Sequence, residues 1–282
     1  MIVMTALWSI NYVVAKIALR EIPALLATGL RSGMAGLIML PIYGWSRRNQ
    51  PSVKRPLNEV VMLLVLGIIG VALNQVFFVI GLSRTSVAHA AIVIGITPIL
   101  VLIIAKGIGQ ETLGAGKLIG MMIALAGVVV LQLGAVKSSP TTLLGDFCVL
   151  LGALTFAIFT VMGKRVSLQF DNITLNTFAY VGGGLSLLPI TLWQSYKFPL
   201  STITFTAWSS VLYMALFSSV ICYLIYYHAL RWAPASRVAA FSYLQPVLAT
   251  VMAIPILGEH PTASIVSGGA LVLAGVFITE RL

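Results

Sequence analysis

The fold is decided by a stretch of sequence that occurs twice. Residues 97–111 read TPILVLIIAKGIGQE, and residues 245–259 read QPVLATVMAIPILGE. Each copy has a proline in second place, an apolar run after it and a glutamate at its end, and 148 positions separate the two copies. Each lies in an apolar segment of roughly 20 residues, the length that crosses a bilayer as a helix. We therefore expect a membrane protein with an internal repeat.

The same 148-residue offset aligns residues along the whole chain. LAGV at 125–128 falls on LAGV at 273–276. Leu and Ala coincide by chance in any apolar chain, whereas prolines, glycines and charged residues that match in register indicate duplication. Other matched positions are Lys16 with Lys164, Gly36 with Gly184, Pro41 with Pro189, Leu82 with Leu230 and Gly120 with Gly268. We predict two copies of one unit, residues 1–135 and residues 144–282.

The composition places both copies in a membrane. Of 282 residues, 59% are hydrophobic and 9% are charged, whereas a soluble domain carries about 25% charged residues. Ten apolar runs are long enough to span a bilayer. The predicted spans are 2–19, 24–45, 59–81, 86–105, 116–135, 144–163, 173–194, 206–229, 236–257 and 262–280. The expected fold class is an all-α membrane protein with ten transmembrane helices and no separate soluble domain.

Five spans per copy is an odd number, so the second copy enters the membrane from the opposite side. Inverted repeats of this kind support two mirror-related states in transporters, with a site at the repeat interface. A duplication with a purely structural role is the alternative. With the N-terminus inside, eleven Lys and Arg residues fall in inner loops and five in outer loops. This bias predicts a multi-pass protein of the inner or plasma membrane, N-in and C-in.

The first two spans and the repeated stretch resemble the EamA family of the drug/metabolite transporter superfamily. The opening spans read LWSINYVVAKIAL at 7–19 and LLATGLRSGMAGLIMLP at 25–41. The fourth and ninth spans carry the proline, the apolar run and the final glutamate, with Gln110 where the second copy has Gly258. The resemblance covers the whole chain. It implies ten helices as two inverted five-helix repeats, a central cavity, and export or exchange of small metabolites.

Polar and aromatic residues gather on particular helix faces and are candidates for lining a substrate cavity. At helical spacing they share one face of the first, third or eighth span, or lie beside the proline of the ninth. The candidates are Trp8, Asn11, Tyr12, Asn74, Phe78, Tyr223, Tyr226, Tyr243 and Gln245. Such a pocket could stack and hydrogen-bond a small solute. The alternative is an interfacial belt, which we favour for Trp193, Trp208 and Trp232.

Two prolines and one arginine lie inside predicted spans. Pro98 and Pro246 each remove a backbone N–H, so we expect repeat-related helix kinks, either flexible points beside the substrate or static features of packing. Arg31 costs at least ~2.5 kcal/mol if it faces lipid, so it should face the interior. It either holds a structural position, which we favour slightly, or binds an anionic group of the substrate.

The acidic residues predict how transport is driven. Each of the seven falls in a loop or within about a turn of a span end. A proton relay uses a carboxylate buried in the bundle, so we predict facilitated diffusion or exchange. Coupling through His89 or His228 is left open. Glu111 and Glu259 each precede a span and are expected to cap helix N-termini.

Several functions are excluded or disfavoured by absent motifs. The chain has no GxxxxGK[ST], HExxH or GxSxG sequence, so we expect no ATP hydrolysis, catalytic residues, metal or cofactor. The net charge of +10 is explained by inner loops and not by nucleic acid. We expect Cys148 and Cys222 to be small buried residues.

The expected function is therefore secondary transport, by an exporter or exchanger of small metabolites such as amino acids or related solutes. The expected partners are this small-molecule substrate and the lipid bilayer. A homodimer through small residues of the fifth or tenth helix is left open. Two other functions are kept as alternatives: a membrane-embedded receptor or assembly subunit without transport, and an intramembrane enzyme.

Overall fold

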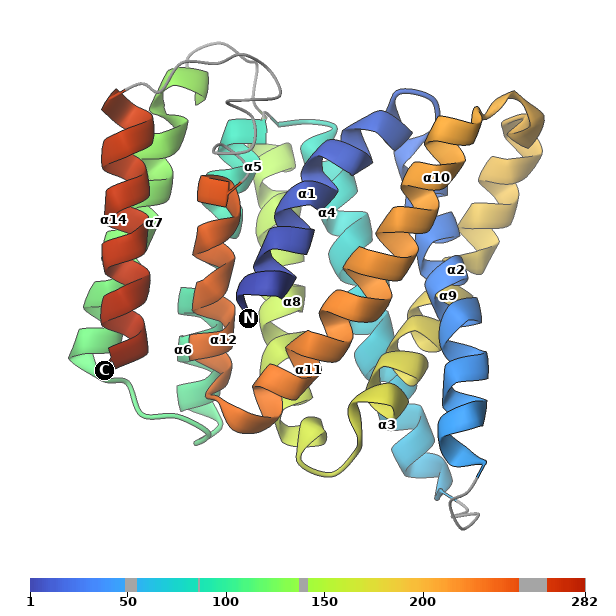
Figure 1. Ribbon diagram of the computed structural model, residues 1–282, viewed down its shortest axis with the longest axis horizontal. Coiled ribbons are helices and arrows are strands. Elements are labelled where there is room, and N and C mark those ends of the chain that lie inside the picture. The colour runs from blue at the N-terminus through green and yellow to red at the C-terminus, as the bar shows by residue number, and fades with distance from the viewer. Residues whose placement is uncertain (49–54, 86, 137–141, 249–262, 282) are drawn as a thin grey trace.

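The computed structural model describes residues 1–48, 55–85, 87–136, 142–248 and 263–281, and no strand occurs in those ranges. Within them, nine helices are long and apolar enough to cross a membrane. Figure 1 shows them side by side as one bundle. The expected all-α membrane fold is therefore confirmed. The expected span 236–257 is described only as far as residue 248.

The spans are of two kinds, continuous helices and helices with an irregular segment. The continuous ones are α1 (Ile2–Leu19), α2 (Ala24–Arg47), α7 (Ala115–Val136), α8 (Leu143–Ser167), α9 (Asn172–Lys197) and α14 (Ala263–Arg281). The third span consists of α3 (Leu57–Gly67), the π-helix η1 (Ile68–Leu73) and α4 (Asn74–Leu82), and the fourth of α5 (Val87–Ile94) and α6 (Thr97–Gly107). A 3₁₀ turn, η2 (Leu200–Thr202), precedes the eighth span, which consists of α10 (Phe205–Tyr213), the π-helix η3 (Met214–Ile221) and α11 (Cys222–Trp232). The ninth begins with α12 (Ala235–Ala240) and the 3₁₀ turn η4 (Phe241–Tyr243).

The irregular features recur at the 148-residue offset. The π-helices η1 and η3 occupy equivalent positions in the third and eighth spans. Hydrogen bonds recur as well: the Asn74 amide Nδ2 donates to the Gly152 carbonyl over 2.9 Å, and the Cys222 thiol donates to the Met4 carbonyl over 3.5 Å. Asn74 is equivalent to Cys222, and Met4 to Gly152. The two bonds therefore join the same two elements of the duplicated unit, with the copies exchanged.

Repeat-related helices also pack directly on each other. Figure 1 shows α7 with α14 on one side of the bundle and α2 with α9 on the other. Glycines permit the close approach, because a Cβ at Gly275 would lie 2.4 Å from the Ala124 nitrogen and a Cβ at Gly120 would lie 2.8 Å from the Gly275 carbonyl oxygen. The small-residue faces of the fifth and tenth spans therefore pack together within one chain.

The first helix of each copy packs with helices of the other copy. α8 packs on η1, α4, α5 and α6, whereas α1 packs on α10, η3 and α11. We call α3 to α6 together with α8 the first group, and α1 together with α10 to α12 the second group. The groups meet where α6 contacts α12 and where α8 contacts α11. This meeting surface carries the candidate site.

Candidate functional site

The π-helix η3 presents backbone carbonyls to polar side chains of other helices. The Trp8 indole Nε1 donates to the Ser218 carbonyl over 3.0 Å, and the Asn176 amide Nδ2 donates to the Val220 carbonyl over 3.1 Å. A π-helix replaces the regular i to i−4 ladder over a short stretch, and a carbonyl inside a membrane must find a partner. α1 and α9 therefore hold η3 in place.

The two serines of η3 bind the polar side chains of the first two spans. The Ser218 hydroxyl donates to Asn11 Oδ1 over 2.8 Å, and the Arg31 guanidinium Nε donates to Ser219 Oγ over 2.8 Å. The Ser219 hydroxyl in turn donates to the Met214 carbonyl over 3.1 Å. Arg31 is half-buried and lies against η3. Its contact is with the protein interior, where the cost of a charge in the bilayer is reduced.

An aromatic cluster joins the two groups next to these serines. The Trp8 ring lies 5.7 Å, centroid to centroid, from both Tyr223 and Tyr226. From α8, Phe156 lies 5.8 Å from Tyr226, and Phe159 lies 5.9 Å from Tyr223. These separations are typical of favourable aromatic pairs. We call Trp8, Phe156, Phe159, Tyr223 and Tyr226 the aromatic cluster.

A hydroxyl pair crosses the same surface. Tyr226 OH and Thr160 Oγ1 lie 2.5 Å apart, and the Thr160 hydroxyl also contacts the Phe156 carbonyl over 2.8 Å. Tyr226 is buried, whereas Trp8 and Asn11 keep part of their surface exposed. The exposed parts of Trp8 and Asn11 could therefore contact a solute with an apolar ring and an amide. Tyr223 and Tyr226 pack against α8 on the other side of the cluster.

The structure brings only some of the predicted cavity residues together. Trp8, Asn11, Tyr223 and Tyr226 meet at η3 and α11, and the backbone carbonyl of Gln245 comes near them by accepting from Ser9 Oγ over 3.3 Å.

Other predicted cavity residues lie elsewhere. The Asn74 amide is used in the bond to Gly152, and Phe78 follows on the same α4 surface, where its backbone approaches Gly152. Tyr243 is buried with Leu102 and Val272 in a separate apolar core. The side chain of Tyr12 lies outside the described residues.

Sequence reasoning missed Phe156 and Phe159. A signal for both was present, because the 148-residue offset carries Trp8 onto Phe156 and Asn11 onto Phe159. The equivalent positions of α1 and α8 therefore face the same cluster from its two sides. Two of the cluster's five members could have been found by applying the repeat to the candidates already chosen.

The fourth span is broken and not kinked around a proline inside a helix. α5 ends at Ile94 and α6 begins at Thr97, so Pro98 lies in the first turn of α6. A proline is well accommodated there, since the first N–H groups of a helix have no intrahelical partner. The interruption expected at Pro98 therefore takes the form of a break at Gly95 and Ile96, directly before the proline, and whether it is a flexible point beside the substrate stays a prediction. Pro246 follows the 3₁₀ turn η4 at the equivalent point of the ninth span.

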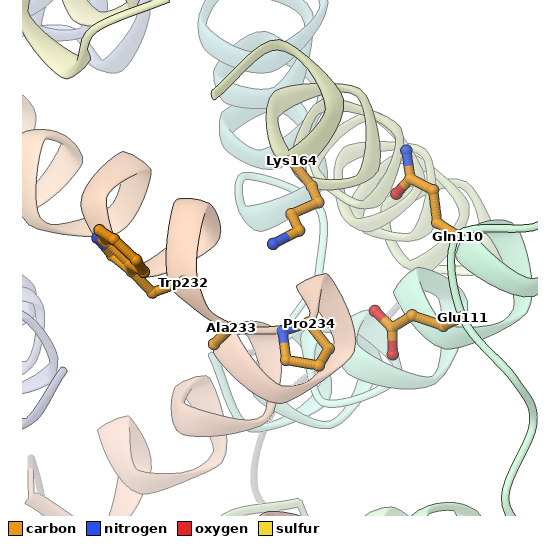
Figure 2. Close-up of a pocket in the computed structure, with 6 residues that line it drawn as sticks. All are labelled: Gln110, Glu111, Lys164, Trp232, Ala233 and Pro234. Atoms are coloured by element: carbon orange, nitrogen blue, oxygen red, sulfur yellow. The ribbon is translucent and has the colours of Figure 1, made fainter. Parts of the chain in front are cut away.

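A cavity, which we call the mouth, lies at the end of the bundle where α6 is joined to α7. Its volume is about 190 Å³. It is lined by the six residues that Figure 2 draws as sticks, Gln110, Glu111, Lys164, Trp232, Ala233 and Pro234. The Lys164 amine and the Glu111 carboxylate both point toward the corner between α11 and α12. Lys164 Nζ donates to the Arg231 carbonyl over 3.3 Å, and Gln110 Nε2 donates to the Val161 carbonyl over 3.2 Å.

Glu111 has three donors at this mouth. Lys117 Nζ donates to it over 3.0 Å, the Ser236 backbone N–H donates over 3.0 Å, and the Ser236 hydroxyl makes a shorter contact. The side chains of Glu111 and Lys117 are only 6% and 11% exposed. Glu111 therefore caps α12, which belongs to the other copy, and not the helix that follows it in sequence. Glu259 lies outside the described residues.

Comparison with known proteins places this architecture in a family. A family model described as the EamA-like transporter family matches residues 1–133 and, a second time, residues 143–281. The chain belongs to the EamA-like transporter family. This family is part of the drug/metabolite transporter superfamily.

Relatives extend over nearly the whole EamA-like chain. The uncharacterized transporter YetK of Bacillus subtilis (strain 168) is 29% identical over 272 residues, which is 95% of this chain and 82% of the relative. An uncharacterized transporter of Archaeoglobus fulgidus is 28% identical over 276 residues, 97% of this chain and 93% of the relative. A solved crystal structure superposes with a TM-score of 0.83 at 19% identity, covering 99% of this chain and 94% of the other, which shows the fold. The protein is a multi-pass membrane transporter.

The described acidic residues of this EamA-like transporter lie at span ends or in loops. They are Glu21, Glu59, Glu111, Asp146, Asp171 and Glu280. Asp146, in the first turn of α8, accepts from Thr85 Oγ1 over 2.5 Å and lies 3.4 Å from His89 Nδ1. Asp171, which caps α9, accepts from Arg47 of α2 over 2.8 Å, so both carboxylates hold helix ends together.

Proposed function

We propose that this EamA-like protein is a secondary transporter that exports or exchanges small metabolites, such as amino acids or related solutes, across the inner or plasma membrane. The observation that carries the proposal is the pair of repeat-related bonds, Asn74 to Gly152 and Cys222 to Met4. They give the two groups equivalent internal hydrogen bonds. Each group could therefore adopt the conformation of the other. That exchange is the basis of alternating access in inverted repeats.

The solute would bind where the groups meet. The exposed part of Trp8 supplies a ring for stacking, and the Asn11 amide beside Ser218 supplies hydrogen bonds. A small molecule with one apolar and one polar end fits such a lining. Arg31 supports the site indirectly, since its bond to Ser219 holds η3 in position. Residues 1–135 and 144–282 are the proposed repeat units, with both termini inside.

The proposed driving force is the solute's own gradient, or exchange for a second solute. The acidic residues named above lie away from the middle of their spans, whereas a proton relay needs a carboxylate inside the bundle. In proteoliposomes, flux of the identified solute should be unchanged by an imposed pH gradient. Uphill accumulation driven by the pH gradient alone, and abolished when one of these acids is changed to its amide, would contradict this part of the proposal.

Metabolite profiling of the medium from cells with and without the protein tests the function and identifies the solute. The solute should then move faster into proteoliposomes that contain the protein than into protein-free liposomes. Asn11→Ala should slow this movement, and Trp193→Ala should not, because Trp193 is 53% exposed and lies outside the cluster. A receptor would bind without moving the solute, and an intramembrane enzyme would convert it into a product.

A further inference from the structure

Contacts at the mouth cross between the two groups. Glu111 follows α6 in the first group and binds Ser236 of α12 in the second, while Lys164 of α8 binds the Arg231 carbonyl of α11. Gln110 ties the same loop to Val161 of α8. Glu111 is therefore tied to the first group through its neighbour Gln110 and to the second group through Ser236. We call the Glu111–Ser236 contact the latch.

The chemistry of the latch suits a contact that opens and closes. Hydrogen bonds to a carboxylate are stronger than those between neutral groups, so the closed state is favoured. A buried charge is strongly destabilised when its partner moves away and leaves it unpaired. Here Lys117, which pairs with Glu111 over 3.0 Å, lies in the first turn of α7, the helix that directly follows the Glu111 loop, so the pair can stay together. The charge of Glu111 therefore remains neutralised after Ser236 moves away.

The latch lies beside a cavity at the end of the surface where the two groups meet. The cavity of about 190 Å³ beside it is lined by residues of both groups. Thr160 lies one helical turn deeper than Lys164 on α8 and contacts Tyr226 of the aromatic cluster. Because Thr160 is fully buried, the two groups would have to separate before a solute could move from the cluster past Thr160 and Lys164 to Glu111.

We propose that Glu111 is a positioning residue of the transport cycle, which closes the path at the α6–α7 end by latching Ser236, and that the cavity beside it is the passage so closed. This inference rests on the proposed transport function. It assigns Lys117 the role of neutralising the open latch, and it makes separation of Glu111 from Ser236 a required step of solute release at this end.

Thiol accessibility tests the latch without any knowledge of the solute. The full-length protein, with Cys148→Ser and Cys222→Ser, carries Thr160→Cys as a reporter, because Thr160 is fully buried in the closed state. Labelling by a membrane-impermeant maleimide is measured in vesicles of both orientations. A separate Leu168→Cys protein identifies which orientation exposes the α6–α7 end, since Leu168 is 59% exposed at the end of α8.

Glu111→Gln should speed labelling of the reporter by about tenfold from that side only, since a charge-assisted bond is lost. Ser236→Ala, which keeps the Glu111–Lys117 pair and the backbone bond, should speed it less. The matched control is Glu21→Gln. Glu21 accepts from the Thr204 N–H and hydroxyl at 2.9 and 2.8 Å with the same chemistry, but at the other end and within the second group's side.

Two results would overturn the latch: Glu111→Gln labels within twofold of its parent, or Glu21→Gln speeds labelling as much as Glu111→Gln does. Ser236→Ala guards against misfolding, because it alters one hydroxyl, and monodisperse elution of each variant confirms that it is folded. Faster labelling combined with no metabolite flux in the unmodified protein would leave the latch intact and overturn the transport proposal instead.

Discussion

Ser218 and Ser219 are neighbours in η3, yet they form hydrogen bonds with different helices. Ser218 binds Asn11 through its hydroxyl and Trp8 through its carbonyl, and Ser219 binds Arg31. Small hydroxyls suit this position because they can accept from one group and donate to another. The polar residues inside these spans are thereby paired with protein and not left to lipid.

Trp8→Phe should destabilise the protein although the ring is retained. The change removes the indole donor and leaves the buried Ser218 carbonyl without it, which costs about 1–3 kcal/mol. The apparent melting temperature in detergent should fall. Trp193→Phe is the control, because Trp193 is 53% exposed and a phenyl ring can keep its cation–π contact with Lys197. Equal melting temperatures for the two variants would argue against a structural role for the Trp8 bond.

Asp171 should give part of the stability a dependence on pH. Burial raises its pKa, but hydrogen bonds from Thr174 and the charge of Arg47 outweigh burial and hold the pKa below its ordinary value of 3.8. A carboxylate with a depressed pKa contributes stability that is present above the ordinary pKa and is lost as pH falls through the lowered value.

Asp171→Ala should therefore lower stability at pH 7 by about 1 kcal/mol, the usual cost of losing a helix cap. Asp171→Asn should cost less, because an amide oxygen can still cap α9. The difference in melting temperature between the parent and Asp171→Asn should shrink as pH falls below 3.8. A difference that stays constant from pH 7 to pH 3 would mean that the Arg47–Asp171 pair adds nothing measurable.

At the scale of the elements, hydropathy predicted the spans but not their irregular segments. Span positions follow from local composition, which is why the nine described spans agree with the expected ones. The π-helix η3 depends on partners far away in sequence, since Trp8 is 210 residues from Ser218 and Asn176 is 44 residues from Val220. The sequence around Ser218 contains no local pattern that predicts those partners.

The candidate site was predictable only in part for the same reason. Tyr226 and Tyr243 both looked like cavity residues, because both lie on helix faces near other polar groups. Their neighbours separate them: Tyr226 meets Thr160 and Trp8, whereas Tyr243 packs among Leu102 and Val272. The packing of the whole bundle decides which neighbour each helix face contacts.

The contact between α7 and α14 should tolerate no added side chain. Gly275→Ala would place its Cβ 2.4 Å from the Ala124 nitrogen and force the helices apart, at a cost of about 1–3 kcal/mol for overpacking. Gly33→Ala is the matched control, because no atom lies within 4 Å of the added Cβ. Expression and melting temperature should fall for the first variant only. Equal behaviour would show that the two helices can separate without loss.

At the scale of the whole molecule, the duplication fixes which loops share a face. The α4–α5 loop and the α8–α9 loop should lie on opposite sides of the membrane. Ser83→Cys and Leu168→Cys, each in a background without Cys148 and Cys222, should therefore react with an impermeant maleimide from opposite sides. Both positions are exposed. The charge bias places Leu168 inside, and labelling of both from one side would refute the inverted arrangement.

The two π-helices also indicate whether a one-residue insertion came before or after the duplication of the chain. The hydrogen bonds of a π-helix span five residues instead of four, so an insertion of one residue could be accommodated there and would shift every later position by one. The 148-residue offset is nevertheless unbroken from Gly36 and Gly184, before the π-helices, to Pro98 and Pro246, after them. Had the insertion entered one copy alone, the offset would change by one residue across it. The simplest lineage is a single ancestral five-helix gene that already carried the extra residue before it was copied and joined to itself.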